Sequence, residues 1–350
     1  MNTPPRKAGY RLAVLTLLLT ACVVVLGAFT RLVDAGLGCP DWPGCYGHIL
    51  WPMDEQEVAR ANATFPDTPV EHDKTWPEQV HRLFASSLGL FCIALSAWYW
   101  RLRREDPDNY RGLSSLSLLL LGVVILQGMF GMWTVTLKLW PQVVTAHLLG
   151  GFTTLSLVWL LVLSTSGRRW ALPPAATQQL LGLRRLVWVA FACVVLQIAL
   201  GGWTTSNYAA LACPDFPQCQ SSWIPEMDFA QGFNLTQDIG PNYLGGLMDS
   251  SARTAIHFTH RVGALLVTAV LLLLYWRLGG IDPVVDRWRR VLLAVLILQI
   301  GLGITNILAS LPLAVAVAHN AGGAVLLLTL VGLLQRSYTV TASGKSFPGQ

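Results

Sequence analysis

Charged side chains are scarce in this chain. Asp, Glu, Lys and Arg make up 12% of its 350 residues, whereas apolar residues make up 53%. A soluble domain carries about a quarter charged residues, so this composition excludes an ordinary water-soluble fold. Several long runs hold no formal charge, among them residues 12–30, 83–100, 112–137 and 291–335. Because about 20 apolar residues cross a hydrocarbon core of about 30 Å, the sequence predicts an all-α polytopic membrane protein.

Eight apolar segments predict eight transmembrane helices. Their expected ranges are 12–32, 78–100, 113–135, 142–165, 185–206, 254–277, 290–309 and 313–335. The last two share one uncharged run, which we divide at Pro312 because a helix accommodates proline in its first turn. The first apolar run continues to Thr30, beyond the length of a signal-peptide core, so we interpret it as a retained span.

The few cations are distributed unevenly between the connections. Seventeen of the 24 Lys and Arg flank alternate helix ends: Arg6, Lys7, Arg11, Arg101, Arg103, Arg104, Arg111, Arg168, Arg169, Arg184, Arg185, Arg277, Arg287, Arg289, Arg290, Arg336 and Lys345. Such a bias marks the cytoplasmic side of a membrane protein. We therefore expect both termini in the cytoplasm, with the long loops 33–77 and 207–253 on the opposite side. The net charge of +5 is interpreted as a topology signal, and no nucleic-acid partner is expected.

The chain also repeats itself at a shift of 172 to 179 residues. Four blocks recur in the same order: residues 27–45 as 201–219, 80–82 as 259–261, 127–131 as 299–303, and 146–151 as 318–323. Each half has four helices, an even number, so both halves enter the membrane from the same side. We predict two four-helix bundles related by a pseudo-twofold axis along the membrane normal, formed by residues 1–167 and 185–350 and joined by a cytoplasmic linker at 168–184.

Four of the seven histidines belong to the repeat, one on each even-numbered span. His81 and His147 lie near the outer ends of the second and fourth spans, and His260 and His319 occupy the matching places in the second half. A single membrane histidine is most often a hydrogen-bonding residue, but two matched pairs at one depth favour bis-imidazole haem ligation, one haem in each half. Zinc is a weaker interpretation because only His257 and His260 are spaced closely enough on one helix.

Two further repeated features have alternative interpretations. The pairs Gly150-Gly151 and Gly322-Gly323 would let a flat macrocycle approach the backbone, or would simply allow close helix packing. Arg82 and Arg261, each following a histidine, could pair with haem propionates or extend to lipid headgroups.

The repeat breaks next to one histidine. Glu78 precedes His81 by three residues, and the matching residue before His260 is His257. A carboxylate beside only one haem site suggests a reactive site in the first half and an electron-transfer or structural site in the second. The alternative is that Glu78 is a first-turn residue stabilised by the helix dipole.

The outer loops contain four of the seven cysteines. Cys39 and Cys45 are six positions apart, as are Cys213 and Cys219. Such pairs form disulfides in an oxidising compartment, and a structural bond is favoured for the second pair while a redox role stays open. Cys22, Cys92 and Cys193 lie within spans and are interpreted as small apolar residues. His48 and His72 are expected in loops without an evident partner.

Taken together, these motifs resemble those of the haem A synthase family, membrane enzymes of cytochrome oxidase assembly. The resemblance spans all eight predicted helices. Its specific parts are the segment Gly-Leu-Gly-Cys-Pro-Asp-Trp-Pro-Gly-Cys at 36–45, Glu78 with His81 and Arg82, His147, His260 with Arg261, and His319.

The resemblance implies oxidation of the C8 methyl group of haem O to a formyl group. It implies that His81 and His147 hold the haem O substrate, that His260 and His319 hold a haem b cofactor, and that Glu78 is the catalytic residue nearest the reacting methyl. It also implies a cell inner membrane location, a haem O synthase and oxidase assembly factors as partners, and an electron partner that the sequence does not identify. A homo-oligomer is compatible with it. The rival hypotheses are a quinol-linked di-haem b electron-transfer protein and a proton-coupled transporter built on two repeats.

Overall fold

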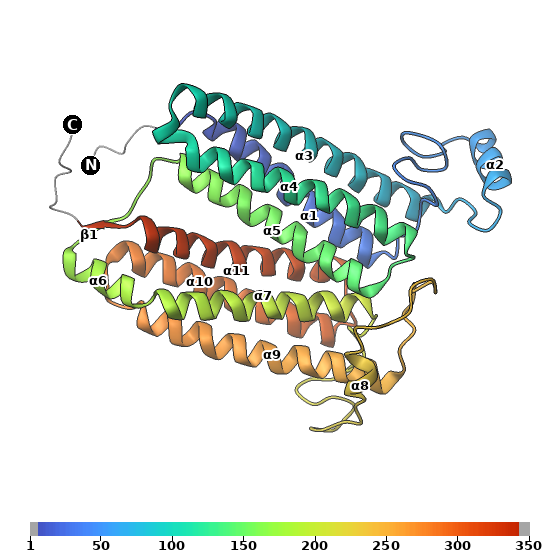
Figure 1. Ribbon diagram of the computed structural model, residues 1–350. Coiled ribbons are helices and arrows are strands. Elements are labelled where there is room, and N and C mark those ends of the chain that lie inside the picture. The colour runs from blue at the N-terminus through green and yellow to red at the C-terminus, as the bar shows by residue number, and fades with distance from the viewer. Residues whose placement is uncertain (1–5, 343–350) are drawn as a thin grey trace.

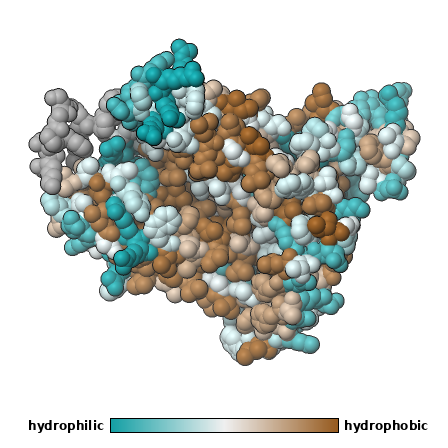
Figure 2. Space-filling view, viewed as in Figure 1, coloured by the Kyte–Doolittle hydropathy of each residue, from teal (hydrophilic) through white to brown (hydrophobic). Residues whose placement is uncertain are grey.

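The structure is a computed structural model that describes residues 6–342. Lys345, one of the cations assigned above to the cytoplasm, and the outermost residues of both predicted halves lie outside this range. Eight long helices dominate it: α1 (Tyr10–Leu32), α3 (His72–Glu105), α4 (Pro107–Thr136), α5 (Pro141–Thr165), α7 (Arg184–Ser206), α9 (Ser250–Arg277), α10 (Pro283–Leu308) and α11 (Leu313–Thr339). Each is long and apolar enough to cross a membrane, which confirms the eight expected spans. Apolar residues cover the middle of the helices, and hydrophilic residues gather toward the ends (Figure 2).

Several helices extend beyond the apolar runs that predicted them. α3 begins at His72 rather than at 78, so the expectation of a loop at His72 is wrong, and Glu78 lies in the second turn rather than the first. α10 begins at Pro283, and Asp282 caps it by accepting a hydrogen bond of 2.8 Å from the Val284 N–H. Apolarity ends where the membrane ends, whereas a capped helix continues into the aqueous layer.

The two tight turns on the side of the outer loops have the same backbone. Lys138 and Leu139 adopt φ of 49° and 61°, and Ser310 and Leu311 adopt φ of 56° and 61°. The left-handed region costs free energy at residues other than glycine, so its recurrence at both turns reflects the same helix-to-helix geometry. The division of the last apolar run at Pro312 is confirmed, because that residue caps α11.

Five short elements were not expected from the sequence. They are α2 (Glu55–Thr64), α6 (Pro174–Gly182), α8 (Phe229–Gly232) and two paired parallel strands, β1 (Ala171–Leu172) and β2 (Thr341–Ala342). The linker between the halves is therefore partly ordered. α2 and α8 lie at one end of the molecule, and β1 and α6 lie at the other (Figure 1).

The eight spans form two rings of four helices. In the first ring α1 and α4 each pack against both α3 and α5, and in the second α7 and α10 each pack against both α9 and α11. The two rings lie side by side (Figure 1), where α1 and α5 of the first ring pack against α11, and α5 also packs against α7. The pseudo-twofold relation of the halves stays a prediction.

Polar side chains join the two rings near the outer loops. Arg31 Nη2 donates to the Thr205 carbonyl at 2.6 Å, and the Tyr208 hydroxyl donates to Asp34 at 2.9 Å. At the far end the indole N–H of Trp159 donates to the Leu328 carbonyl at 3.0 Å. These contacts hold the two halves in one arrangement.

The packed cores occupy only part of each ring. In the first ring the buried cluster contains Leu88, Leu95, Tyr99, Leu120 and Leu161, all toward the end away from the outer loops. In the second ring the corresponding large cluster contains residues 267–274 of α9, Leu278 just after it, residues 285–296 of α10 and residues 324–334 of α11. The buried residues of both clusters lie mainly on the side of the repeated histidines that faces away from the outer loops.

Candidate functional site

The four repeated histidines come from diagonal helices. His81 on α3 and His147 on α5 belong to opposite corners of the first ring, since neither helix is among the close packing partners of the other. His260 on α9 and His319 on α11 are placed in the same way in the second ring. Each bundle therefore presents two imidazoles toward one interior region.

A glycine on the neighbouring helix supports each imidazole. A Cβ added at Gly27, Gly131, Gly201 or Gly303 would lie 2.9, 3.6, 3.3 and 3.1 Å from Cε1 of His81, His147, His260 and His319, respectively. At Gly27 any other side chain would force the His81 ring to shift, and at Gly201 and Gly303 the imidazole would have to move by a few tenths of an ångström. The sequence repeat therefore conserves the glycines that contact the imidazoles as well as the histidines themselves.

The imidazoles have free ligating capacity. Nδ1 of His81, His147 and His319 is buried without a hydrogen-bond partner. Buried polar atoms normally have partners, so these rings fit a role in which another group occupies them. Among residues 6–342 no three His, Cys, Asp or Glu gather closely enough to hold a metal ion by themselves. Paired imidazoles without carboxylates or thiolates suit the two axial positions of a haem iron better than a zinc ion.

Gly150 and Gly322 have a different neighbour from the one the sequence suggested. A Cβ at either glycine would collide with a glutamine side chain from the adjacent helix, Gln127 or Gln299. The absence of a side chain at Gly150 and Gly322 therefore makes room for a glutamine that packs between the two helices. Gly151, with nothing near its Cβ position, is the glycine that leaves open space.

Both pairs of loop cysteines form disulfides, as predicted. Cys39 is bonded to Cys45 and Cys213 to Cys219. In each loop an aspartate organises the turn: Asp41 accepts hydrogen bonds from the Tyr46 and Gly47 N–H groups at 2.6 and 2.8 Å. Asp215 accepts from the Gln220 and Ser221 N–H groups at 2.6 and 2.7 Å, and these bonds hold the pKa of Asp215 below its ordinary value of 3.8. The two loops therefore share the same disulfide and the same aspartate-stabilised turn.

Glu78 lies between the first loop and the histidine level. It is only 4% exposed, and its Oε2 accepts a hydrogen bond of 2.9 Å from the Cys39 N–H. Its Oε1 pairs with Arg82 Nη2 at 2.5 Å. Arg82 also donates to the Asp41 and Gly44 carbonyls at 2.8 and 2.6 Å. A paired and hydrogen-bonded carboxylate is held one helical turn from His81.

His257 has the same neighbours in the second half. It is also 4% exposed, and its Nδ1 accepts a hydrogen bond of 3.2 Å from the Cys213 N–H. Arg261 Nε lies 3.3 Å from His257 Nε2, and the Arg261 guanidinium donates to the Gln218 and Cys213 carbonyls. An acid and an imidazole therefore occupy equivalent places, each linking an arginine to a disulfide loop.

Both arginines are engaged in the loops. This is a third role beside the two considered from the sequence, and propionate pairing by Arg82 and Arg261 stays a prediction. His48 lies in the first loop, where its backbone pairs with Cys45. Cys92 is fully buried in an apolar core, as expected for a small apolar residue, whereas Cys22 is exposed on the helix surface and Cys193 is partly so.

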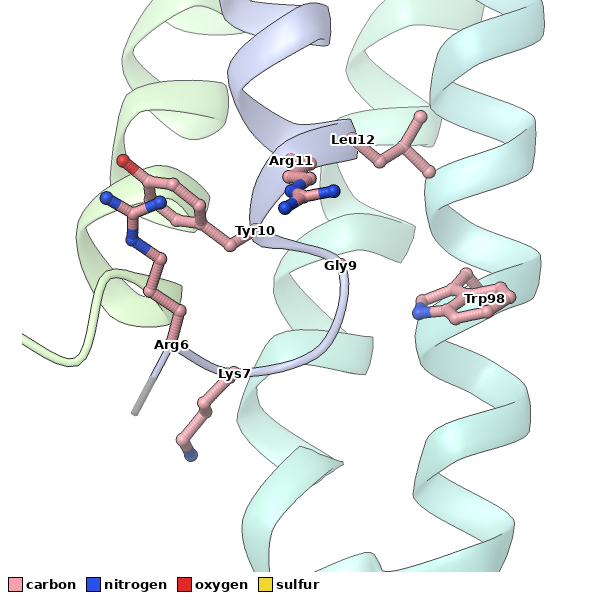
Figure 3. A pocket seen from close by; sticks show the side chains of 7 residues that line it. All are labelled: Arg6, Lys7, Gly9, Tyr10, Arg11, Leu12 and Trp98. Carbon is pink, nitrogen blue, oxygen red and sulfur yellow. The ribbon is translucent and has the colours of Figure 1, made fainter. Parts of the chain in front are cut away.

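The cavity in Figure 3 is separate from these residues. It has a volume of about 500 Å³ and lies at the start of α1, lined by Arg6, Lys7, Gly9, Tyr10, Arg11, Leu12 and Trp98. Gly27 follows Tyr10 by about 26 Å along a helix that rises 1.5 Å per residue. The cavity therefore lies at the opposite end of the bundle from the histidines.

Comparison with known proteins agrees with this geometry. The family model COX15-CtaA, described as cytochrome oxidase assembly protein, matches residues 10–331, from the first span into the eighth, with both disulfide loops and the four histidines. The chain belongs to the COX15-CtaA family.

Relatives in this family match over most of their length. The heme A synthase of Shewanella oneidensis is 44% identical over 91% of this chain and 93% of its own. The heme A synthase of Halalkalibacterium halodurans is 27% identical over 91% of this chain and 94% of its own. The human heme A synthase COX15 is 29% identical over 92% of this chain and 82% of its own.

Sequence reasoning missed one set of residues at the site of this COX15-CtaA protein. Gln197 and Gln299 each lie against an imidazole: Gln197 Nε2 is 3.1 Å from His260 Nδ1, and Gln299 Nε2 is 3.3 Å from His319 Nε2. Each amide also donates to the backbone carbonyl of the same histidine, at 2.9 and 3.0 Å. The recurrence of Gln127 as Gln299 was a signal for one of them, whereas Gln197 has no counterpart in the repeat.

Proposed function

We propose that this chain is a haem A synthase, which converts haem O to haem A for cytochrome oxidase assembly by oxidising the C8 methyl group to a formyl group. Family membership supports the overall reaction. The observation that carries the site is the pair Glu78 and His257: two residues with equivalent contacts, of which only the one in the first half is an acid. Only the first half thereby places a carboxylate beside its pair of histidines.

The halves then have different tasks. Residues 1–167 hold the haem O substrate between His81 and His147, residues 168–184 form the linker, and residues 185–350 hold a haem b cofactor between His260 and His319. Haem b supplies one-electron redox chemistry when bound. The chain itself supplies imidazoles on diagonal helices, and each imidazole contacts a glycine of the neighbouring helix. These imidazoles lie between the apolar cores and the outer loops.

Glu78 acts at the substrate. The Cys39 N–H and Arg82 fix both of its oxygens, so the carboxylate has one orientation. From this place it accepts a proton from the reacting methyl region or stabilises positive charge that develops there. Arg82 in turn is held by two loop carbonyls, which makes the first disulfide loop a support for the acid.

The remaining features place the protein in its membrane. Both termini face the cytoplasm of the cell inner membrane, and the histidines and disulfide loops face the periplasm, where cysteines oxidise. Membrane lipid surrounds the apolar helix surfaces. A haem O synthase delivers the substrate, and oxidase assembly factors receive the product.

Pigment analysis tests this proposal against its rivals. The protein is purified from cells with and without a haem O synthase, and its haems are identified by pyridine haemochrome spectra. We expect haem b in both preparations, and haem O or haem A only when the synthase is present. Two equivalents of haem b and never haem O or A would favour the di-haem electron-transfer protein, and absence of a Soret band would favour the transporter.

A further inference from the structure

The tips of the two disulfide loops, residues 42–50 and 216–224, expose apolar side chains at matching places. Trp42, Ile49 and Leu50 of the first tip correspond in the repeat to Phe216, Trp223 and Ile224 of the second. All six are exposed, and the exposed fractions of Ile49 and Ile224 reach 82% and 79%. Single exposed apolar residues are ordinary, whereas a cluster that recurs on both halves indicates an interaction surface.

Neither loop tip contains Asp, Glu, Lys or Arg. The aspartates that precede the tips, Asp41 and Asp215, turn their carboxylates to backbone N–H groups of the loops. The next charged residues along the chain are Asp54 and Glu226. Transfer from water to an apolar medium is costly for an ionised side chain, and neither tip carries one.

Hydrogen bonds hold each loop tip beside the first turns of a span. Arg82 on α3 and Arg261 on α9 donate to backbone carbonyls within the two tips, at 2.6 and 2.8 Å. The Gln79 amide on α3 donates to the Ile49 carbonyl. The uncharged run of α3 begins at Leu83, about 6 Å along the axis from Gln79, because a helix rises 1.5 Å per residue. The tips therefore lie at the level where the spans enter the hydrocarbon.

The two loop tips belong to opposite edges of the molecule. α3 packs mainly against α1 and α4, and α9 against α7, α8 and α10, so neither helix borders the other ring. Figure 1 shows α3 along one edge of the paired rings and α9 along the other. A single partner protein would have to reach around both rings to cover both tips, whereas a lipid bilayer surrounds the molecule on every side.

We propose that both loop tips insert into the membrane leaflet on their side, so that their six apolar side chains contact lipid at the boundary between headgroups and acyl chains. Tryptophan is enriched at this boundary, and uncharged apolar segments beside a span bind there. The inference does not depend on the proposed reaction. It adds one consequence for the site, because lipid contact at the first tip restrains the loop that holds Arg82 and, through it, Glu78.

Nitroxide accessibility in vesicles tests the proposal. p-Acetylphenylalanine replaces Trp42 or Phe216, and a hydroxylamine nitroxide is attached to its ketone, so that no cysteine is added near the disulfides. The protein alone is reconstituted into vesicles of phosphatidylethanolamine and phosphatidylglycerol. Power saturation of the EPR signal then compares access of oxygen, which concentrates in lipid, with access of Ni-EDDA, which stays in water.

Oxygen should dominate at both tip labels. The same label at Gln56, an exposed residue of α2 in the first loop, is the control and should be reached mainly by Ni-EDDA. Dominant access of Ni-EDDA at both tips in these protein-only vesicles would overturn the proposal and favour a protein partner for this surface.

Charged substitutions distinguish insertion by the native side chains from partitioning of the label itself. Trp223→Glu with Ile224→Glu should raise Ni-EDDA access at the Phe216 label several-fold, because ionised carboxylates hold the tip in water. Leu235→Glu with Ile239→Glu is the matched control, an exposed apolar pair of the same loop outside the tip, and should leave that label unchanged.

The first tip is tested in the same way. Ile49→Glu with Leu50→Glu should raise Ni-EDDA access at the Trp42 label, again several-fold. Unchanged access in the glutamate variants of both tips would contradict insertion by the native residues. The measurement needs no bound haem, so failure of the proposed function would leave its result standing.

Discussion

Glu78 Oε2 accepts a hydrogen bond of 2.9 Å from the Cys39 N–H, and so the acid beside the first pair of histidines is fastened to a disulfide-bonded loop. The matching contact in the second half joins His257 Nδ1 to the Cys213 N–H at 3.2 Å. The two halves therefore share the same contact between the helix and the disulfide loop, with a carboxylate at this position in the first half and an imidazole in the second. This pairing supplies a matched control for each test of the first half.

Glu78→Gln should stop haem O conversion while leaving haem b bound. The amide keeps an oxygen for the Cys39 N–H but cannot take up a proton, so we expect conversion to fall by about 100-fold or more, as for loss of a general base. Pigment extraction after expression with a haem O synthase measures the ratio of haem A to haem O. His257→Gln alters the equivalent place and should convert at nearly the normal rate. Normal haem A production by Glu78→Gln would contradict the role given to this acid.

Histidine variants should separate the two haems. His260→Ala and His319→Ala should lose haem b, because each removes one axial ligand of the second ring. His81→Ala and His147→Ala should keep haem b and lose bound haem O. The haemochrome spectrum of each purified variant gives the ratio. Loss of the same haem from all four variants would show that the halves are not assigned as proposed.

The two disulfides should differ in their effect on activity. Each closes a short loop, and a loop of this length contributes about 2 kcal/mol to stability in the chain-entropy model. Replacing Cys213 and Cys219 by Ser should lower thermal stability and leave conversion nearly unchanged. Replacing Cys39 and Cys45 by Ser should lower both, because the loop positions Glu78 and Arg82. Thermal melts and pigment ratios of the two double variants provide the comparison, and equal conversion by both would argue against support of Glu78 by the first loop.

The second loop should loosen in acid. Hydrogen bonds from the Ser221 and Gln220 N–H groups hold the pKa of Asp215 below 3.8. A lowered pKa in the folded loop means that ionised Asp215 contributes stability above pH 3.8, and that this contribution is lost as the pH falls through the lowered value. Hydrogen exchange of the amides at residues 220 and 221 should therefore be slower than in Asp215→Asn at neutral pH, and this difference should disappear as the pH falls through the lowered pKa. Identical exchange in the two proteins at pH 7 would contradict this.

Much of the architecture followed from one-dimensional patterns. Uncharged runs predicted all eight spans because only apolar segments of that length are stable across lipid, and the repeat placed four histidines at matching positions. Helix ends were less accessible to this reasoning: α3 starts at His72 because the helix continues into water, beyond the point where hydropathy carries information. α2 and α8 are short and largely polar, and α6 places only Ala176 and Leu180 in the core, too few apolar positions for a periodic pattern.

The sequence by itself determined that this is a multi-pass helical membrane protein with paired histidines, one acid and two cysteine loops. Only the tertiary structure decided what these residues touch. It directed Arg82 and Arg261 to loop carbonyls, joined Glu78 and His257 to the cysteine N–H groups, and placed Gln197 against His260. The physical reason is that lipid selects segments by composition alone, whereas a hydrogen bond depends on the register between helices far apart in the chain, and packing sets that register.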